Sequence, residues 1–127
     1  MKKIETCNAP GAIGPYSQSM VSGKLVFTSG QIPLDPATGA LVGDTIEAQS
    51  EQALKNLQSV LEAGGASLST VVKTTCFLSD MGNFAAFNAV YARFFTGDCP
   101  ARSCVAVKTL PKNVLVEVEA IAETSIC

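Results

Sequence analysis

Residues 44–65 carry the pattern that most constrains the fold of this chain. Asp44 followed by Glu47 predicts a capping box at the start of a helix, and Gly64-Gly65 predicts its end. The apolar residues in between recur at helical spacing and share one face: Ile46, Ala53, Leu54, Leu57, Val60 and Leu61. A helix with one apolar face packs on another layer of secondary structure, so strands on either side of it are expected.

Short extended segments surround this helix. Residues 17–22 and 24–29 predict a hairpin that turns at Gly23, and residues 29–42, rich in glycine and proline, predict a loop. Residues 70–80 predict a longer strand. We expect one face of that strand to carry four residues: Val72, Thr74, Cys76 and Leu78.

A second helix is predicted from about Asn83 to Thr96. Its stripe is aromatic and is interpreted as core rather than as a cofactor site: Phe84, Phe87, Tyr91, Phe94 and Phe95. Two further strands, within residues 99–120, close the chain. The order of elements is ββ–α–β–α–ββ, which predicts a single α+β domain over residues 1–127, with a mixed sheet packed against two helices on one face.

The last two strands are predicted to pair as a hairpin around a loop at residues 109–112. Antiparallel counting then places Arg102 opposite Glu119 and Cys104 opposite Glu117, with all four on one face. Arg102 and Glu117 become diagonal neighbours, roughly 7–8 Å apart at their backbones. That gap can admit a small anion and a water. The competing interpretation is a solvated salt bridge on an open sheet face.

Composition narrows the classes of partner. Hydrophobic residues make up 47% and charged residues 16%, which suggests that another subunit covers part of the apolar surface. No apolar run approaches the roughly 18 residues of a membrane span, and the N-terminus lacks the apolar segment of a signal peptide, so a cytoplasmic location is expected. The net charge is −2 without a basic run, which disfavours nucleic acid.

The chain has no histidine, so the commonest general base and zinc ligand are absent and no metal site is expected. Its five cysteines show no CxxC spacing and are interpreted as free thiols rather than a disulfide framework: Cys7, Cys76, Cys99, Cys104 and Cys127.

Four segments together resemble the RidA (YjgF) family of reactive-intermediate deaminases. They are NAPGAIGPYSQ (8–18), FTSGQIPLDPATG (27–39), VVKTTCFLSDMGNFAAFNAVYARFF (71–95) and CPARSCVAVKTLPKNVLVEVEAIA (99–122). The resemblance implies a chorismate-mutase-like fold and a homotrimer with a barrel-like sheet core and sites between subunits. It also implies hydrolysis of the enamines and imines released by pyridoxal-phosphate-dependent dehydratases, 2-iminobutanoate and 2-iminopropanoate among them, to 2-oxoacids and ammonia. No metal or organic cofactor is implied.

The family's site residues carry over position by position onto seven residues. Three are expected to be catalytic: Arg102, Glu117 and Tyr16. Arg102 is also expected to bind substrate, together with four others: Cys104, Ser29, Gly30 and Asn88. An arginine suits bidentate binding of the substrate carboxylate, and a glutamate can deprotonate the attacking water. Cys104 has no accompanying base, so a pocket-lining role is favoured over a nucleophile.

Three alternatives stay open. The same trimer could be a non-catalytic sensor of small carboxylates, a translation-inhibiting or ribonuclease-like relative, or a holdase chaperone. An acidic chain without histidine makes phosphodiester cleavage chemically awkward. Two segments depart from the family pattern: the loop TGDCPAR at residues 96–102 looks short, and the tail ETSIC ends in the unexplained Cys127. The preferred imine and the dehydratase that supplies it are not indicated.

Overall fold

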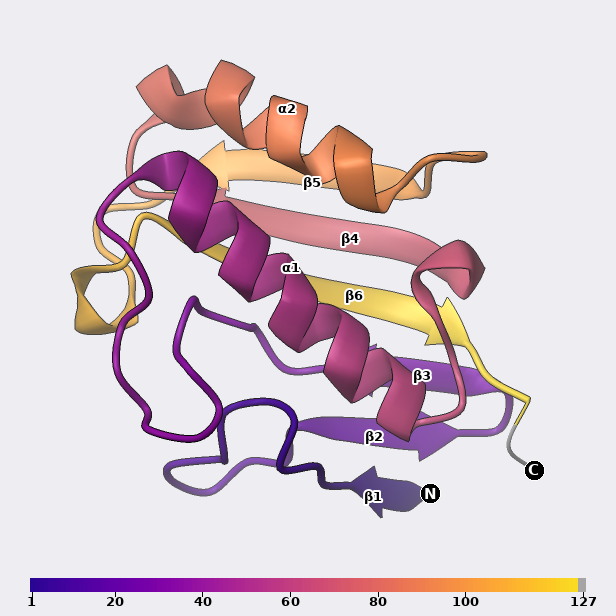
Figure 1. Cartoon of the computed structure of the whole chain (residues 1–127). Coiled ribbons are helices and arrows are strands. Elements are labelled where there is room, and N and C mark those ends of the chain that lie inside the picture. Colours follow the sequence, from indigo (N-terminus) through magenta and orange to yellow (C-terminus); the bar gives the residue numbers. More distant parts are fainter. Residues whose placement is uncertain (126–127) are drawn as a thin grey trace.

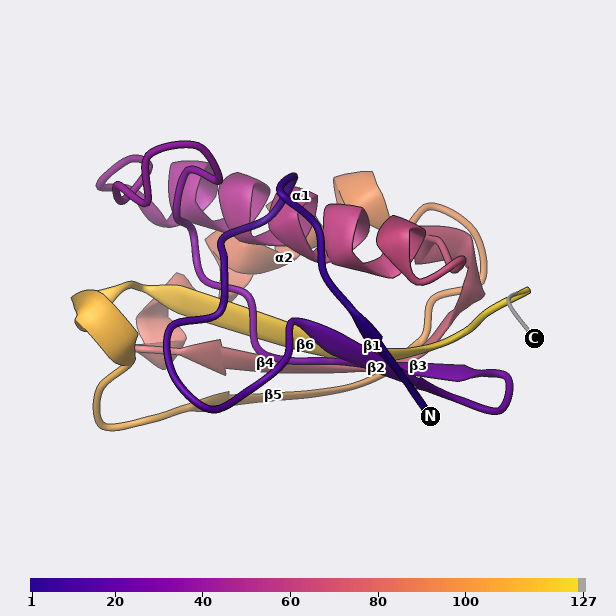
Figure 2. The same ribbon diagram turned by 90° about the horizontal axis from the view of Figure 1, so that it is seen from below.

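Two helices cover one face of a six-stranded sheet in the computed structural model, which describes residues 1–125 (Figures 1 and 2). Within those residues the opposite face of the sheet has no covering layer (Figure 2). The architecture is therefore the single α+β domain that the sequence predicted, with a mixed sheet and both helices on the same side.

The strand order is β1-β2-β3-β6-β4-β5, and β4 with β5 is the parallel pair. The elements follow one another as β1 (Lys2–Ile4), β2 (Ser19–Ser22), β3 (Leu25–Thr28), α1 (Ile46–Ala63), β4 (Val71–Leu78), α2 (Phe84–Phe94), β5 (Ala101–Ala106) and β6 (Val116–Glu123). Short 3₁₀ turns lie at Leu68–Thr70, Met81–Asn83 and Pro111–Asn113. The sequence missed β1, which has only three residues, of which one is buried.

The α1 helix buries the whole predicted face, since its six apolar residues there are at most 8% exposed. Its start differs from the prediction. The N-cap is Thr45, whose side chain accepts a hydrogen bond from the backbone N–H of Ala48. The prediction of a capping box formed by Asp44 and Glu47 is therefore wrong. The helix ends at Gly64 as predicted, and Gly65 adopts the left-handed conformation with φ 81°.

The predicted faces of β4 and α2 are confirmed with one exception. Thr74, Cys76 and Leu78 are buried under the helices, but a bulge between Val71 and Lys73 buries Val71 and turns Val72 outward. In α2 the aromatic residues all pack in or against the core: Phe84, Phe87, Tyr91, Phe94 and the following Phe95.

The predicted hairpin of the last two strands is wrong. β5 and β6 do not pair, because β4 lies between them, parallel to β5 and antiparallel to β6. Residues 107–115 cross from the β5 edge to the interior of the sheet, with Lys112 and Asn113 in the left-handed conformation. The side chains on the inward face of β6 are at most 4% exposed. The central position in the sheet therefore buries more of β6 than a position at the edge of the sheet beside β5 would.

The new pairing changes which side chains share a face. Arg102 aligns with Thr74, and Cys104 aligns with Cys76, so both point toward the helices. Glu117 aligns with Phe77 and points away from the helices, as does Glu119, two residues on. The expectation that Arg102, Cys104, Glu117 and Glu119 share one face is therefore wrong.

The described cysteines are all free: Cys7, Cys76, Cys99 and Cys104. Cys127 lies outside the described residues. Among residues 1–125, no cluster of cysteine and acidic side chains could hold a metal ion, and neither described helix is long and apolar enough to cross a membrane.

Candidate active site

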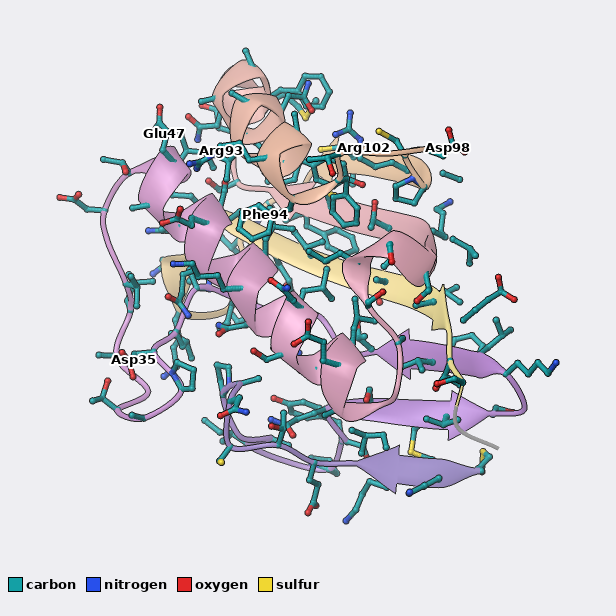
Figure 3. The ribbon with its side chains drawn as sticks, turned by 45° about the vertical axis from the view of Figure 1, so that its right-hand side comes forward. Asp35, Glu47, Arg93, Phe94, Asp98 and Arg102 are labelled. Atoms are coloured by element: carbon teal, nitrogen blue, oxygen red, sulfur yellow. The ribbon has the colours of Figure 1, made fainter. Side chains whose placement is uncertain are left out.

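Arg102 lies in the edge strand β5, with its side chain beside α2 (Figure 3). Its Nη1 donates a hydrogen bond of 2.7 Å to Oδ1 of Asn88. Its guanidinium carbon lies 5.4 Å from the ring centroid of Phe84 and 4.8 Å from that of Tyr91. An open cavity of about 520 Å³ adjoins this cluster, between α2 and the start of β5. The arginine is thus held in place at the rim of a space large enough for a small anion.

Cys104 lies on the same side of β5 as Arg102 and beside the buried Cys76. Burial raises the pKa of the Cys104 thiol, and the positive charge of Arg102 opposes that rise. Burial also raises the pKa of Cys76, to about 12. Because the thiolate is the nucleophilic form, the raised pKa of Cys104 favours a lining role for this residue over covalent catalysis.

Glu117 lies on the open face of the sheet, in a separate cavity of about 380 Å³ that Phe77, Val107 and Leu110 also line. Burial raises the pKa of the Glu117 carboxyl, and the nearby charge of Glu119 adds to the rise. A carboxyl with a raised pKa is a stronger base than an ordinary glutamate, which suits it to accept a proton from water.

Gly30 lies directly against the Glu117 carboxylate. A Cβ atom at position 30 would overlap Oε2 of Glu117, so only glycine leaves room for this carboxylate. The neighbouring backbone is fixed as well, because Gln31 exchanges two backbone hydrogen bonds with Val118 of β6. The turn that follows β3 and the centre of β6 thus form one rigid unit.

Ser29 connects the turn that carries Gly30 to the loop that carries Tyr16. The Ser29 hydroxyl donates to the carbonyl of Ser17 at 2.6 Å, and the Ser29 N–H donates to the carbonyl of Gln18. These bonds connect the loop that carries Tyr16 to the turn beside Glu117. Tyr16 itself is 51% exposed and lines an open cavity of about 730 Å³.

The structure therefore brings six of the seven predicted residues together in two places, which we call half-sites. The first, the arginine half-site, consists of Arg102, Asn88 and Cys104. The second, the glutamate half-site, consists of Glu117 and Gly30, with Ser29 next to Gly30 in the same turn. Tyr16 lines a different cavity, and its loop is connected to this turn through the hydrogen bonds of Ser29. Arg102 and Glu117 point to opposite faces of the sheet, so a single copy of the chain does not bring the two half-sites together.

Sequence reasoning missed the roles of Phe84 and Tyr91. Both were interpreted as core, yet their rings also contact the Arg102 guanidinium. The available signal was their spacing, because residues 84, 88 and 91 follow one stripe of a helix. The expected alignment of Glu119 opposite Arg102 is wrong, since Glu119 aligns with Thr75 on the open face.

Comparisons with known proteins agree with this architecture. The model of the family described as Endoribonuclease L-PSP matches residues 6–124. A protein of Salmonella typhimurium named 2-iminobutanoate/2-iminopropanoate deaminase is 52% identical over 124 residues, covering 95% of this chain and 96% of the relative. A Lactococcus lactis protein, named as a candidate regulator AldR, is 51% identical over 123 residues, or 97% and 98% of the two chains.

A solved structure with a bound small molecule is also similar. The crystal structure of Escherichia coli TdcF with bound serine superimposes with a TM-score of 0.93 and 46% identity, covering 98% of this chain and 100% of that chain. Identity near 50% over almost the full length, together with the matched family model, leaves one conclusion. The chain belongs to the Endoribonuclease L-PSP family, also called the RidA or YjgF family.

Proposed function

We propose that this protein is an enzyme that hydrolyses 2-iminobutanoate and 2-iminopropanoate to 2-oxoacids and ammonia. The observation that carries the proposal is that the chain holds both a pre-oriented arginine and a carboxyl of raised pKa, on opposite faces of one sheet. The first suits a substrate carboxylate, and the second suits activation of water. A relative 52% identical bears the name of this deaminase.

The proposal includes a homotrimer in which the arginine half-site of one subunit meets the glutamate half-site of the next. Support comes from the open face of the sheet, which exposes Leu25, Phe27 and Val105 and also carries Phe77 and Ile121. An apolar sheet face of this kind is typical of a subunit interface. Light scattering should give about three times the 13.2 kDa of one chain.

The chemistry needs no cofactor. Arg102 binds the carboxylate of the protonated imine bidentately, and this fixes the electrophilic carbon near Glu117 of the partner subunit. Glu117 takes a proton from water as the water oxygen bonds to that carbon. Protonated Glu117 returns its proton to the nitrogen of the resulting carbinolamine. The C–N bond then breaks as the hydroxyl proton passes back to Glu117 and the C=O bond forms, so ammonia leaves with the 2-oxoacid as product and carries the proton away as ammonium. The proposal assigns proton relay to Tyr16, whose loop is connected to the turn beside Glu117 through the hydrogen bonds of Ser29.

A coupled assay tests this function. Threonine dehydratase releases 2-iminobutanoate from threonine, and formation of 2-oxobutanoate is followed with and without the protein. We expect faster release with the wild-type protein and little acceleration with Arg102→Lys, because lysine keeps the charge and loses the planar fork of donors. Wild-type protein that leaves the rate unchanged contradicts the proposal. A cytoplasmic location beside such dehydratases is part of the same proposal.

A carboxylate sensor without turnover is the second candidate. It is favoured by the 51% identity to a relative named as a candidate regulator, because Arg102 could bind a carboxylate in either role. The two candidates separate in the coupled assay, since a sensor binds 2-oxobutanoate and leaves imine hydrolysis unchanged. Ribonuclease action is less favoured, because the chain combines a net charge of −2 with no histidine.

A further inference from the structure

Three side chains of α2 surround the guanidinium of Arg102. Phe84, Asn88 and Tyr91 are spaced i, i+4 and i+7, so they follow one stripe of the helix toward β5. The two rings contact the guanidinium carbon at 5.4 and 4.8 Å, and the amide of Asn88 accepts one N–H bond at 2.7 Å. We call these three residues the α2 cradle.

The Tyr91 ring is itself held rigidly. Its hydroxyl is 2.8 Å from Oγ1 of Thr74 in β4, and its ring stacks on Phe95 with centroids 4.5 Å apart. Phe87 packs on it as well, at 5.6 Å. Tyr91 is only 6% exposed, so the face that it presents to Arg102 is part of the core. A fixed ring face restricts where the guanidinium plane can lie.

The cradle leaves part of the guanidinium free. Asn88 accepts a hydrogen bond from one N–H of Nη1, and a guanidinium carries five N–H donors in all. The remaining donors can still form a bidentate pair with a carboxylate. A long, flexible arginine side chain loses less freedom on binding when its orientation is already set.

We propose that Phe84 and Tyr91 are positioning residues that hold the Arg102 guanidinium in its carboxylate-binding orientation. The inference rests on the proposed function, since it takes Arg102 to be the residue that binds the substrate carboxylate. It assigns to two core aromatics an effect on substrate affinity in addition to their packing.

Arginine side-chain NMR reads out the orientation directly, because the chain contains two arginines, Arg93 and Arg102. Arg93 is exposed and pairs with Glu51, so it serves as an internal reference. Ring currents from the cradle should shift the Arg102 Nε–H signal away from that of Arg93. Tyr91→Leu should return the signal toward the reference position. Phe94→Leu, the loss of a partly buried ring of the same helix with no described contact to Arg102 or Tyr91, should leave the signal unchanged.

Affinity for 2-oxobutanoate, measured by calorimetry, gives the functional readout. Loss of one cation–π contact in Tyr91→Leu should weaken binding by roughly 3- to 30-fold. In the coupled assay KM should rise by a similar factor, while kcat stays within about twofold, because the clamp binds substrate and transition state alike. Tyr91→Phe combined with Thr74→Val keeps the ring and removes both hydroxyls, so it should restore the affinity.

Each outcome decides the proposal. Wild-type affinity and an unmoved Arg102 signal in folded Tyr91→Leu overturn it. If Tyr91→Leu does not fold, Phe84→Leu, at a partly buried position, decides in the same way. A wild-type protein that binds 2-oxobutanoate but hydrolyses no imine refutes the proposed function and does not contradict the positioning role of the α2 cradle. A wild-type protein that does not bind 2-oxobutanoate at millimolar concentration refutes that positioning role.

Discussion

Arg102 and Glu117 lie on opposite faces of one sheet, in strands that β4 separates. Their side chains therefore diverge within one copy of the chain. A site that uses both residues needs a second copy, and the two half-sites must then belong to different subunits.

Mixed assemblies test this arrangement. Arg102→Lys removes the arginine half-site and Glu117→Gln removes the glutamate half-site, so each variant alone should have little activity. When the two are co-expressed and mix at random, about a quarter of the interfaces carry both intact half-sites. We expect the mixture to recover about that fraction of wild-type activity in the dehydratase-coupled assay.

The control is a mixture of the two separately purified variants, measured before subunits exchange. It should show no recovery. Co-expressed variants that stay inactive while light scattering shows them assembled together would place both residues in the same subunit's site.

Gly30→Ala should displace the Glu117 carboxylate, because the new methyl group would overlap Oε2. We expect a loss of imine hydrolysis comparable to that of Glu117→Gln, on the order of 10²-fold or more. Affinity for 2-oxobutanoate, set mainly by Arg102, should change much less. Gly97→Ala is the matched control, since a Cβ there meets no atom within 4 Å. Equal activity of the two variants would show that Glu117 does not need its observed position.

The sequence predicted the helices and strands of this fold better than the order in which the strands pair. Helical spacing correctly identified the buried face of α1, because burial produces a pattern within each element separately. The order in which strands pair produces no comparable pattern in the sequence. The short connection between β5 and β6 favoured a hairpin. In the structure β6 instead occupies the buried centre of the sheet, and β4 lies between it and β5.

The same error affected the candidate site. The seven residues were taken from a family resemblance, and the proposed single face for Arg102 and Glu117 followed from the wrong hairpin. The contact between Gly30 and Glu117 was also beyond the sequence, because it joins residues 87 positions apart through the placement of β6 beside the turn after β3.

Glu117→Gln should remove hydrolysis without destabilising the fold. The amide keeps the size of the side chain and cannot accept a proton from water, so hydrolysis should fall by about 10²–10⁴-fold. The folded protein should lose no stability at neutral pH. A raised pKa means that the fold favours the protonated carboxyl, so the ionised form opposes folding above the ordinary pKa and a neutral amide removes that cost. Chemical denaturation at pH 7 measures this, and a clear loss of stability would contradict the assignment.

The acid limb of the pH–rate profile should report Glu117 and respond to Glu119. Glu117 acts as a base only when ionised, so activity should fall as pH drops through its pKa, at a pH above that of an ordinary glutamate.

Burial is the main cause of the raised pKa of Glu117, and the charge of Glu119 is the second. Glu119→Gln removes that like charge, which lowers the pKa of Glu117 and should move the acid limb to lower pH. Glu123→Gln, an exposed change in the same strand, should leave the limb in place. A limb that moves equally in both variants would reflect net charge rather than the pair, and a limb that Glu119→Gln moves upward would contradict the assignment of Glu117 as the base.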